Sequence, residues 1–116
     1  YIEEAQQPLL VAMIEHINAV ENLNTILKVG GLDAILIGPY DLSASMGLTE
    51  QFNHPEFLAM MATIQTRTDF AGVPCGVHVV KPSEIMLQQR INEGHRFVAY
   101  SIDSVVLSTF IKNPLL

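Results

Sequence analysis

AILIGPYD, residues 34–41, is an apolar run that passes through a Gly-Pro pair and ends on an acidic side chain. Three further apolar runs with little polar alternation occupy residues 9–14, 73–80 and 97–102. Nearly continuous runs of this length are typical of strands that are buried on both faces of a parallel sheet. We therefore predict four parallel strands, over these three ranges and over residues 34–37.

Helical patterns separate the predicted strands. Apolar residues recur at helical spacing over residues 19–27, 57–68 and 85–91, and a last apolar segment covers residues 105–111. Glycine is expected to end such helices, proline to lie in a first turn, and serine or aspartate to cap an N-terminus. The predicted boundary residues, in chain order, are Gly30 and Gly31, Pro55 and Gly72, Ser83 and Gly94, then Asp103 or Ser104 as a cap and Pro114 as an end.

The order of these elements, β-α-β-α-β-α-β-α, favours parallel strands joined by right-handed helical crossovers. Two of the three intervals between strand starts are close to 25 residues, about the repeat of an eight-unit barrel of about 250 residues. The middle interval is longer by about 15 residues, and the excess lies in residues 41–53, directly after a strand, where α/β enzymes build active sites. The predicted fold class is α/β, a parallel (β/α)8 TIM barrel of which this chain supplies four units. A doubly wound sheet is the alternative, although no glycine-rich phosphate loop follows the first run.

The composition restricts the classes of partner. The 116 residues carry 12 acidic and 6 basic side chains, and the basic ones are scattered, whereas nucleic-acid binding needs a concentrated positive field. No apolar run approaches the ~20 residues that span a membrane, so we expect neither nucleic acid nor membrane as a partner. The charged fraction of 16% is low against about 25% in soluble domains. A piece of a larger body, or an oligomer subunit, is therefore favoured.

The single cysteine, Cys75, lies in an apolar stretch. It is expected to be a small buried side chain, and an intrachain disulfide is excluded. No secretory signal is visible, so we expect a cytoplasmic protein. Because the chain begins with Tyr1 and not with Met, we expect further residues before it in the natural protein.

Two acidic residues, Glu15 and Asp41, follow the ends of the first and second predicted strands. Carboxylates at the C-terminal ends of neighbouring parallel strands face the same mouth of a barrel, close enough to share one hard cation. Ions such as Mg²⁺ are often held by one or two carboxylates, with substrate and water in the other positions. The residues alone leave an alternative open, in which each carboxylate is a helix N-cap or a solvated charge at the rim.

Several short motifs resemble the HpcH/HpaI aldolase/citrate lyase family, and the most specific of them is IGPYDLSASMG at residues 37–47. The similarity covers nearly all of this chain but only about the second half of a family member. It implies that residues 1–116 are the C-terminal half of a single TIM-barrel domain, its last four βα units, with the N-terminal half missing. The other similar segments are residues 13–15, 19–23, 31–34, 72–77 and 97–99 with Asp103.

The resemblance implies a metal site and a reaction. In that family a Glu on the fifth strand and an Asp on the sixth bind the divalent metal, and these positions match Glu15 and Asp41, which are 41 − 15 = 26 residues apart. The implied ion is Mg²⁺, Mn²⁺ or Co²⁺, which chelates pyruvate and stabilises its enolate as a Lewis acid. The implied enzyme is a carbon–carbon lyase, a class II aldolase that reversibly cleaves a 4-hydroxy-2-oxo acid to pyruvate and an aldehyde. The family's His base and Arg lie in the half that is absent here, so we expect no catalytic base in this chain and no activity of this chain alone.

The resemblance also implies a seat for the pyruvate carboxylate at residues 38–41. Pro39 has no N–H, so the amides of Tyr40 and Asp41 would receive the carboxylate, near a short helix that we expect to begin at residues 42–43. For the Ser43 hydroxyl we expect a local backbone hydrogen bond. Met13 stands where many family members carry Gln, and it would line the pocket without hydrogen bonding.

The four histidines have different expected roles. His78 ends the third predicted strand, where relatives usually present an apolar residue. Facing the pocket, it would contact the aldehyde partner or its carboxylate, and a structural role is the alternative. His16 adjoins Glu15 but faces the opposite side of the strand, so we do not expect it to be a shared ligand. His54 is expected at the surface of a helix start, and His95 in a polar loop.

Two other functions stay open. An acyl-CoA lyase of the citrate lyase or citramalyl-CoA type would keep the fold and the enolate chemistry, although the motif at residues 37–47 favours the aldolase branch. A non-catalytic half-barrel, either a fragment or an assembly module, would cover its open strand edges by dimerising. The expected partners are therefore a small 2-oxo acid and an aldehyde, and further copies of the chain in a homo-oligomer.

Overall fold

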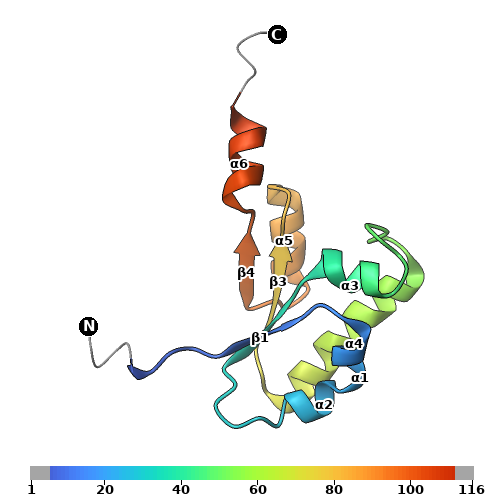
Figure 1. The fold of residues 1–116 in the computed structure, drawn as a ribbon, viewed down its shortest axis with the longest axis vertical. Coiled ribbons are helices and arrows are strands. Elements are labelled where there is room, and N and C mark those ends of the chain that lie inside the picture. The colour runs from blue at the N-terminus through green and yellow to red at the C-terminus, as the bar shows by residue number, and fades with distance from the viewer. Residues whose placement is uncertain (1–5, 112–116) are drawn as a thin grey trace.

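The structure, a computed structural model, describes residues 6–111. Within them one sheet contains four parallel strands in chain order: β1 (Val11–Ile14), β2 (Ala34–Ile37), β3 (Cys75–Val79) and β4 (Phe97–Tyr100). Helical segments connect each strand to the next (Figure 1). A barrel needs this sequential order, whereas a doubly wound sheet reverses its order at a switch point. The predicted α/β class and the centres of all four predicted strands are confirmed.

Three of the predicted strands are shorter in the structure than in the prediction. β1 begins only at Val11. β3 begins after Pro74, which has no N–H to give to a ladder. β4 ends at Tyr100 because Ser101 has a φ of +62°, which lies outside the extended region.

The helices of the described residues are, in chain order, α1 (Ile17–Glu21), α2 (Leu23–Ile26), α3 (Pro39–Ser45), α4 (Pro55–Ala71), α5 (Glu84–Asn92) and α6 (Asp103–Phe110). Two predicted boundaries are confirmed in their chemistry. α4 has Pro55 in its first turn and ends at Gly72 with a φ of +69°, a backbone conformation that favours glycine. The Ser83 hydroxyl caps α5 by accepting a hydrogen bond from the Met86 amide at 3.2 Å.

Other helix boundaries differ from the prediction. The first helical segment is two helices that meet at Asn22 and end at Ile26, before the predicted stop at Gly30 and Gly31. α3 begins at Pro39 and not at residues 42–43, because the fixed φ of proline suits a first helical position.

The predicted cap of the last helix was also wrong. The N-cap of α6 is Ile102, whereas the Asp103 carboxylate accepts a hydrogen bond only from the next amide, at Ser104. α6 ends at Phe110, and Pro114 lies outside the described residues.

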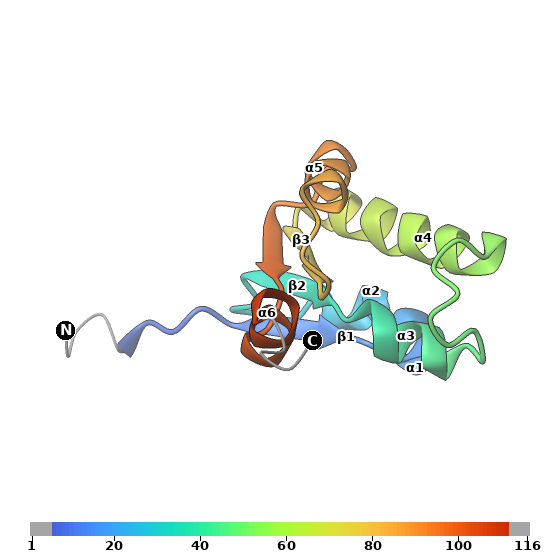
Figure 2. The same cartoon turned by 90° about the horizontal axis from the view of Figure 1, so that it is seen from above.

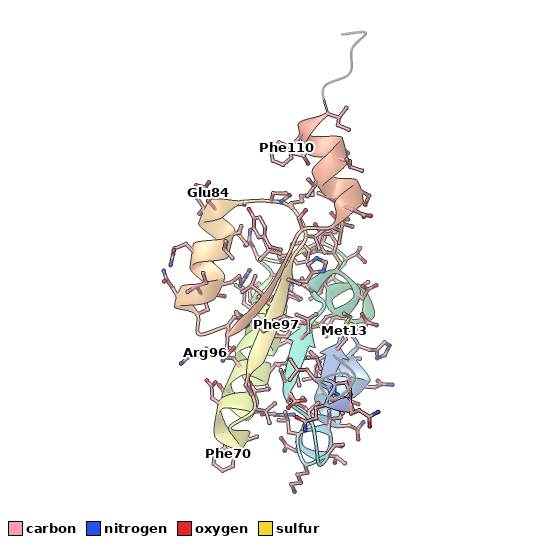
Figure 3. The ribbon with its side chains drawn as sticks, turned by 90° about the vertical axis from the view of Figure 1, so that its left-hand side faces the viewer. Met13, Phe70, Glu84, Arg96, Phe97 and Phe110 are labelled. Carbon is pink, nitrogen blue, oxygen red and sulfur yellow. The ribbon has the colours of Figure 1, made fainter. Side chains whose placement is uncertain are left out.

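The core lies on one face of the sheet, under α1 to α4 (Figure 2). Met13 and Phe97 lie on the other face, where they are 51% and 42% exposed (Figure 3). The two faces are therefore unequal: one carries the packed helices, and the other is the face that a closed barrel would turn inward. The core side chains are Ile14, Ile35, Ile37, Cys75 and Val77 from the strands and Val20, Leu23, Leu42, Phe57, Met61 and Ile64 from the helices.

Among residues 6–111 no helix has both the length and the apolar character to cross a membrane.

Candidate functional site

A recess of about 200 Å³ lies at the C-terminal ends of β1, β2 and β3. The polypeptide reaches it at the strand ends and at the start of α3, so its walls come from segments far apart in the sequence. We call it the strand-end recess. Every residue for which we predicted a metal or substrate role lines it, together with Met13. Its lining residues are Met13, Glu15, Gly38, Pro39, Tyr40, Asp41, His78, Val80 and Ile102.

The two carboxylates enter the recess from different elements. Glu15 directly follows β1, whereas Asp41 lies in the first turn of α3. Both side chains are exposed, and neither makes a hydrogen bond or an ion pair with another residue between 6 and 111. Carboxylates in this state keep all their lone pairs for a ligand.

Gly38 keeps the Glu15 side of the recess open. A Cβ added at Gly38 would lie 3.3 Å from Oε2 of Glu15 and 3.7 Å from the Met13 sulfur. The absence of a side chain at this position therefore leaves the space next to the carboxylate free. The Gly38 amide donates to the Ile14 carbonyl at 3.1 Å, so the backbone continues the β1–β2 ladder to this point.

The start of α3 presents free backbone amides. The first intrahelical bond of α3 runs from the Leu42 amide to the Gly38 carbonyl, so the amides of Tyr40 and Asp41 have no helical acceptor. Neither amide has an acceptor elsewhere in the described part of the chain. The positive end of the α3 dipole and these two donors can together receive an anion.

Aromatic packing and two serines hold α3 in place. The Tyr40 ring meets Phe52 edge-on at a centroid distance of 4.9 Å, and Phe52 in turn lies 5.6 Å from the buried ring of Phe57. The Ser43 hydroxyl donates to the Tyr40 carbonyl at 2.8 Å, which confirms the local backbone bond predicted for it. The Ser45 hydroxyl accepts from the Ile17 amide at 3.0 Å and so ties α3 to the start of α1.

His78 lies in the recess and also makes a structural contact. Its side chain lines the recess, and its Nε2 lies 3.1 Å from the Ser101 carbonyl oxygen. Ser101 is buried and its amide donates to the Val79 carbonyl at 2.7 Å. His78 is therefore fixed to the loop that follows β4.

The donor set of the recess fits a hard divalent cation. Two carboxylates with free oxygens are the ligands that Mg²⁺ uses, with water and substrate completing the octahedron. Among residues 6–111 there is no group of three or more His, Cys, Asp and Glu side chains arranged to hold a metal. Within the described part of the chain, a cation in the recess would thus have at most two of these side chains as ligands.

The other predicted polar residues lie outside the recess. His16 and His54 cap helices, where their Nδ1 atoms accept from the amides of Asn18 and Glu56. Cys75 is buried, as predicted, and burial raises the pKa of its thiol to about 11.

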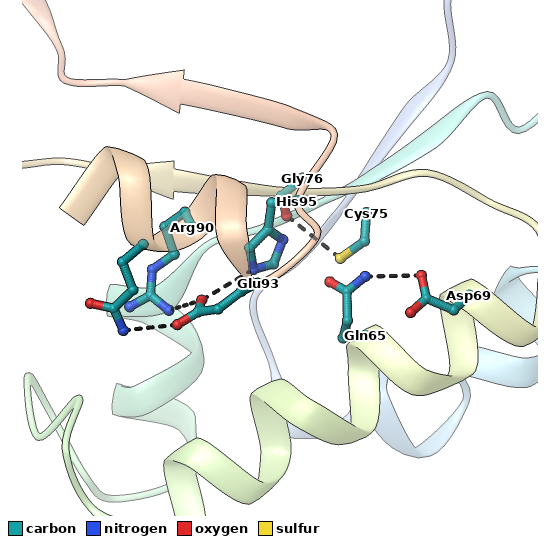
Figure 4. A network of polar contacts seen from close by, with 8 residues as sticks. Gln65, Asp69, Cys75, Gly76, Arg90, Glu93 and His95 are labelled. Atoms are coloured by element: carbon teal, nitrogen blue, oxygen red, sulfur yellow. Dashed lines mark hydrogen bonds and ion pairs between the residues drawn. The ribbon is translucent and has the colours of Figure 1, made fainter. Parts of the chain in front are cut away.

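His95 lies in a loop, as predicted, but its burial was not predicted. Its ring sits between α4 and α5 beside Gln65, and its Nε2 is 3.9 Å from the Glu93 carboxylate (Figure 4). Burial lowers the pKa of His95, and the Glu93 charge opposes this shift in part.

Four parallel strands in sequential order, with two acidic side chains in a recess at their C-terminal ends, are the arrangement of part of a (β/α)8 barrel. The sequence model of the HpcH/HpaI aldolase/citrate lyase family matches residues 2–109. The chain belongs to this family.

Two curated relatives are similar to this chain over nearly all of its length. The chain is 35% identical over 116 residues to a 2-keto-3-deoxy-L-rhamnonate aldolase of Salmonella paratyphi A, with 99% of this chain and 43% of the relative covered. It is 38% identical over 106 residues to the protein of the same name from Escherichia coli O1:K1 / APEC, with 91% and 39% covered. The chain thus spans about two fifths of the length of these relatives.

Solved structures agree with the fold. The HpcH/HpaI aldolase of Desulfitobacterium hafniense DCB-2 superposes with a TM-score of 0.80 at 30% identity, over 88% of this chain and 39% of that one. A family protein of Burkholderia cenocepacia J2315 gives a TM-score of 0.80 at 26% identity, over 87% and 38%. Because these neighbours are TIM-barrel proteins, the sheet of this chain is part of such a barrel.

The sequence analysis included Gly38 in the predicted seat at residues 38–41 without a role of its own, and it singled out neither Ser101 nor Ile102. Gly38 carried a signal, since a glycine at a strand end often marks a close approach. Ile102 and Ser101 carried none, because the left-handed backbone at Ser101 places both of them and is not encoded in any local pattern of residue types.

Proposed function

We propose that the intact protein is a carbon–carbon lyase, a class II aldolase that reversibly cleaves a 4-hydroxy-2-oxo acid into pyruvate and an aldehyde. The observation that carries this proposal is the strand-end recess, which is lined by two carboxylates and two amides that have no partner among residues 6–111. Family membership and relatives named as aldolases support it. Because this chain spans only part of those relatives, the proposal concerns the intact protein.

Each lining residue has a distinct part in the proposal. The amides of Tyr40 and Asp41 would donate to the carboxylate of pyruvate, with Pro39 as the wall beside them. The carboxylates of Glu15 and Asp41 would hold a divalent cation, Mg²⁺, Mn²⁺ or Co²⁺. Such a cation supplies Lewis-acid stabilisation of the negative charge that develops on the 2-oxo oxygen. Met13 would form an apolar part of the wall.

The remaining catalytic groups are proposed to lie outside this chain. Residues 1–116 would be the C-terminal half of one barrel domain, and a His base and an Arg would come from the other half. The relatives are named for a 2-keto-3-deoxy sugar acid, and a substrate of that class has the 2-oxo acid end that the recess would bind.

Substitution of the two carboxylates in the intact protein tests the metal role. Glu15→Gln and Asp41→Asn are each expected to reduce pyruvate release and to weaken Mn²⁺ binding, seen by isothermal titration calorimetry, by more than about 100-fold. Glu21→Gln is the matched control, because Glu21 is an exposed carboxylate on α1 outside the recess. Full activity in EDTA would exclude a metal role. Cleavage of acyl-CoA substrates, without cleavage of hydroxy-oxo acids, would favour the acyl-CoA lyase function.

We further propose that the intact protein is a cytoplasmic homo-oligomer with small molecules as its other partners. Exposed apolar side chains such as Ile85 and Ile91 on α5 provide surface that association would cover. Light scattering of the intact protein is expected to give a multiple of the chain mass, and a monomer would contradict this part of the proposal.

A further inference from the structure

Glu15 and His78 stand in one row across the sheet, two strands apart. The register of β1, β2 and β3, continued by one residue, sets Glu15, Gly38 and His78 side by side, and Ala99 of β4 completes the row. Paired residues of neighbouring strands project from the same face of a sheet, and the strands are ~4.8 Å apart. The backbones at Glu15 and His78 are therefore separated by about 10 Å.

The middle of this row is open. Gly38 has no side chain and Ala99 has a small one, so the long side chains stand at Glu15 and at His78. A Cβ at Gly38 would come within 3.3 Å of the Glu15 carboxylate. Both Glu15 and His78 line the strand-end recess. No other long side chain of this row therefore stands between the carboxylate and the imidazole.

The contact with Ser101 fixes the tautomer of His78. Nε2 lies 3.1 Å from the Ser101 carbonyl oxygen, and a carbonyl oxygen can only accept. In the neutral ring Nε2 therefore carries the proton, and Nδ1 keeps a lone pair. Nδ1 has no hydrogen-bond partner among residues 6–111 and is thus an acceptor available to a ligand.

Ser101 is held in a conformation that aims its carbonyl at His78. Its φ of +62° is in the left-handed region, which is disfavoured for a residue other than glycine. The residue is buried, and its amide is bonded to the Val79 carbonyl at 2.7 Å. Strained residues of this kind cluster at ligand sites, where the surrounding structure imposes an orientation.

Resting on the proposed function, we propose that His78 selects substrates with a hydroxyl group at C4. The unprotonated Nδ1 of His78 accepts a hydrogen bond from that hydroxyl, while the 2-oxo acid end of the substrate lies on the Glu15 side of the row. His78 thereby recognises the half of the substrate that becomes the aldehyde, and it takes no part in binding the pyruvate half.

Two rates of the intact protein separate these halves. The first is exchange of the methyl protons of pyruvate with D₂O, followed by NMR, which needs no aldehyde. The second is kcat/KM for cleavage of 4-hydroxy-2-oxopentanoate. His78→Gln is expected to lower the cleavage kcat/KM about 10- to 100-fold, because one hydrogen bond to the hydroxyl is lost. Exchange is expected to stay within about 3-fold of wild type, since the pyruvate half keeps its contacts.

A matched pair of variants separates binding from a structural role. The Asn side chain places an acceptor near the position of Nδ1, whereas the Gln side chain places a donor near Nε2 and can keep the bond to the Ser101 carbonyl. His78→Asn is therefore expected to retain cleavage better than His78→Gln. The reverse order would show that the bond to Ser101 is what matters, and it would overturn the proposal.

A spectroscopic measurement keeps the proposal testable if the variants fail to fold. Two-bond ¹H–¹⁵N correlation of the His78 ring in the wild-type protein is expected to show a protonated Nε2 and a bare Nδ1. The opposite tautomer would overturn the proposal. Unchanged cleavage by His78→Gln, or an equal loss of exchange and cleavage, would overturn it as well. A wild-type protein with neither exchange nor cleavage would overturn the proposed function itself.

Discussion

The first three strands and the last one are covered to very different degrees. Above β1, β2 and β3, α4 alone buries Phe57, Met61, Ile64 and Thr68. α5 and α6, which flank β4, bury no residue at all within the described part of the chain. Ile85 on α5 is 81% exposed. The sheet is continuous across all four strands, but the buried hydrophobic core includes strand residues of β1, β2 and β3 only.

This difference shows which region of the molecule provides most of the stability and which region forms most of the site. The strand-end recess draws on β1, β2, α3 and β3, which all belong to the well-packed region. The loop after β4, in the region with little packing, contributes Ile102 to the recess and the Ser101 carbonyl that contacts His78. The proposed seat for the metal and the pyruvate carboxylate should thus be formed more firmly than the His78 contact. Three experiments probe the contrast.

The largest effect is expected from removing a matched aromatic side chain in each region. Phe57→Ala removes a ring that is 2% exposed, and we expect it to lower the free energy of unfolding by about 3–5 kcal/mol. Phe110→Ala removes a ring that is 70% exposed, and the expected change is within about 0.5 kcal/mol. Urea unfolding followed by circular dichroism measures both. Equal losses would show that α6 is packed as tightly as α4.

A smaller effect is expected at the seam between the two regions. Gly76→Ala would bring a Cβ to 2.5 Å from the Phe97 carbonyl oxygen, so β3 and β4 must move apart at a cost of about 1–3 kcal/mol. Gly30→Ala is the control, because nothing lies within 4 Å of its added Cβ. Hydrogen exchange is expected to accelerate at β4 amides in Gly76→Ala only. An unaltered β4 would mean that the seam tolerates the side chain.

The smallest effect is expected from the pH response of His95, which lies where α4 meets α5. Desolvation lowers the pKa of His95 below the ordinary value of 6.5, and the nearby Arg90 charge lowers it further. The Glu93 charge, a backbone hydrogen bond at Cys75 and the Asp69 charge oppose the shift. A histidine with a lowered folded-state pKa contributes stability above the unfolded pKa and loses it as the pH falls.

The measurement is the free energy of unfolding at pH 8 and at pH 5 for wild type and for His95→Gln. Wild type is expected to lose more stability than the variant between these values. If the two proteins lose the same amount, the buried imidazole is not responsible for the acid sensitivity.

Local chemistry was sufficient to predict much of the fold. The apolar runs gave the strand centres, and Gly72 and Ser83 marked their helix ends, because each acts on its own neighbours. Boundaries that depend on distant contacts were not predictable. The Arg67 guanidinium donates to the Val20 carbonyl across 47 positions of sequence, and no local pattern contains such a bond. The burial of His95 has the same origin.

The acidic residues of the candidate site could be predicted from the sequence, but the local geometry of the site could not. Glu15 and Asp41 were visible as acids after apolar runs, and the structure brings both to one recess. The start of α3 at Pro39 and the backbone at Ser101 were not visible, since both depend on how the strand ends pack. Residue types could indicate the donors of the site but not the directions in which they are held.

The contact of Tyr40, Phe52 and Phe57 connects the turn that carries the free amides to the interior. The affinity that this turn would have for a small anion therefore depends partly on residues that do not contact the anion. Selection for a tighter ligand and selection for a more heat-resistant protein would act on the same ring at Phe57. An engineer who alters this core should check the Michaelis constant as well as the melting temperature.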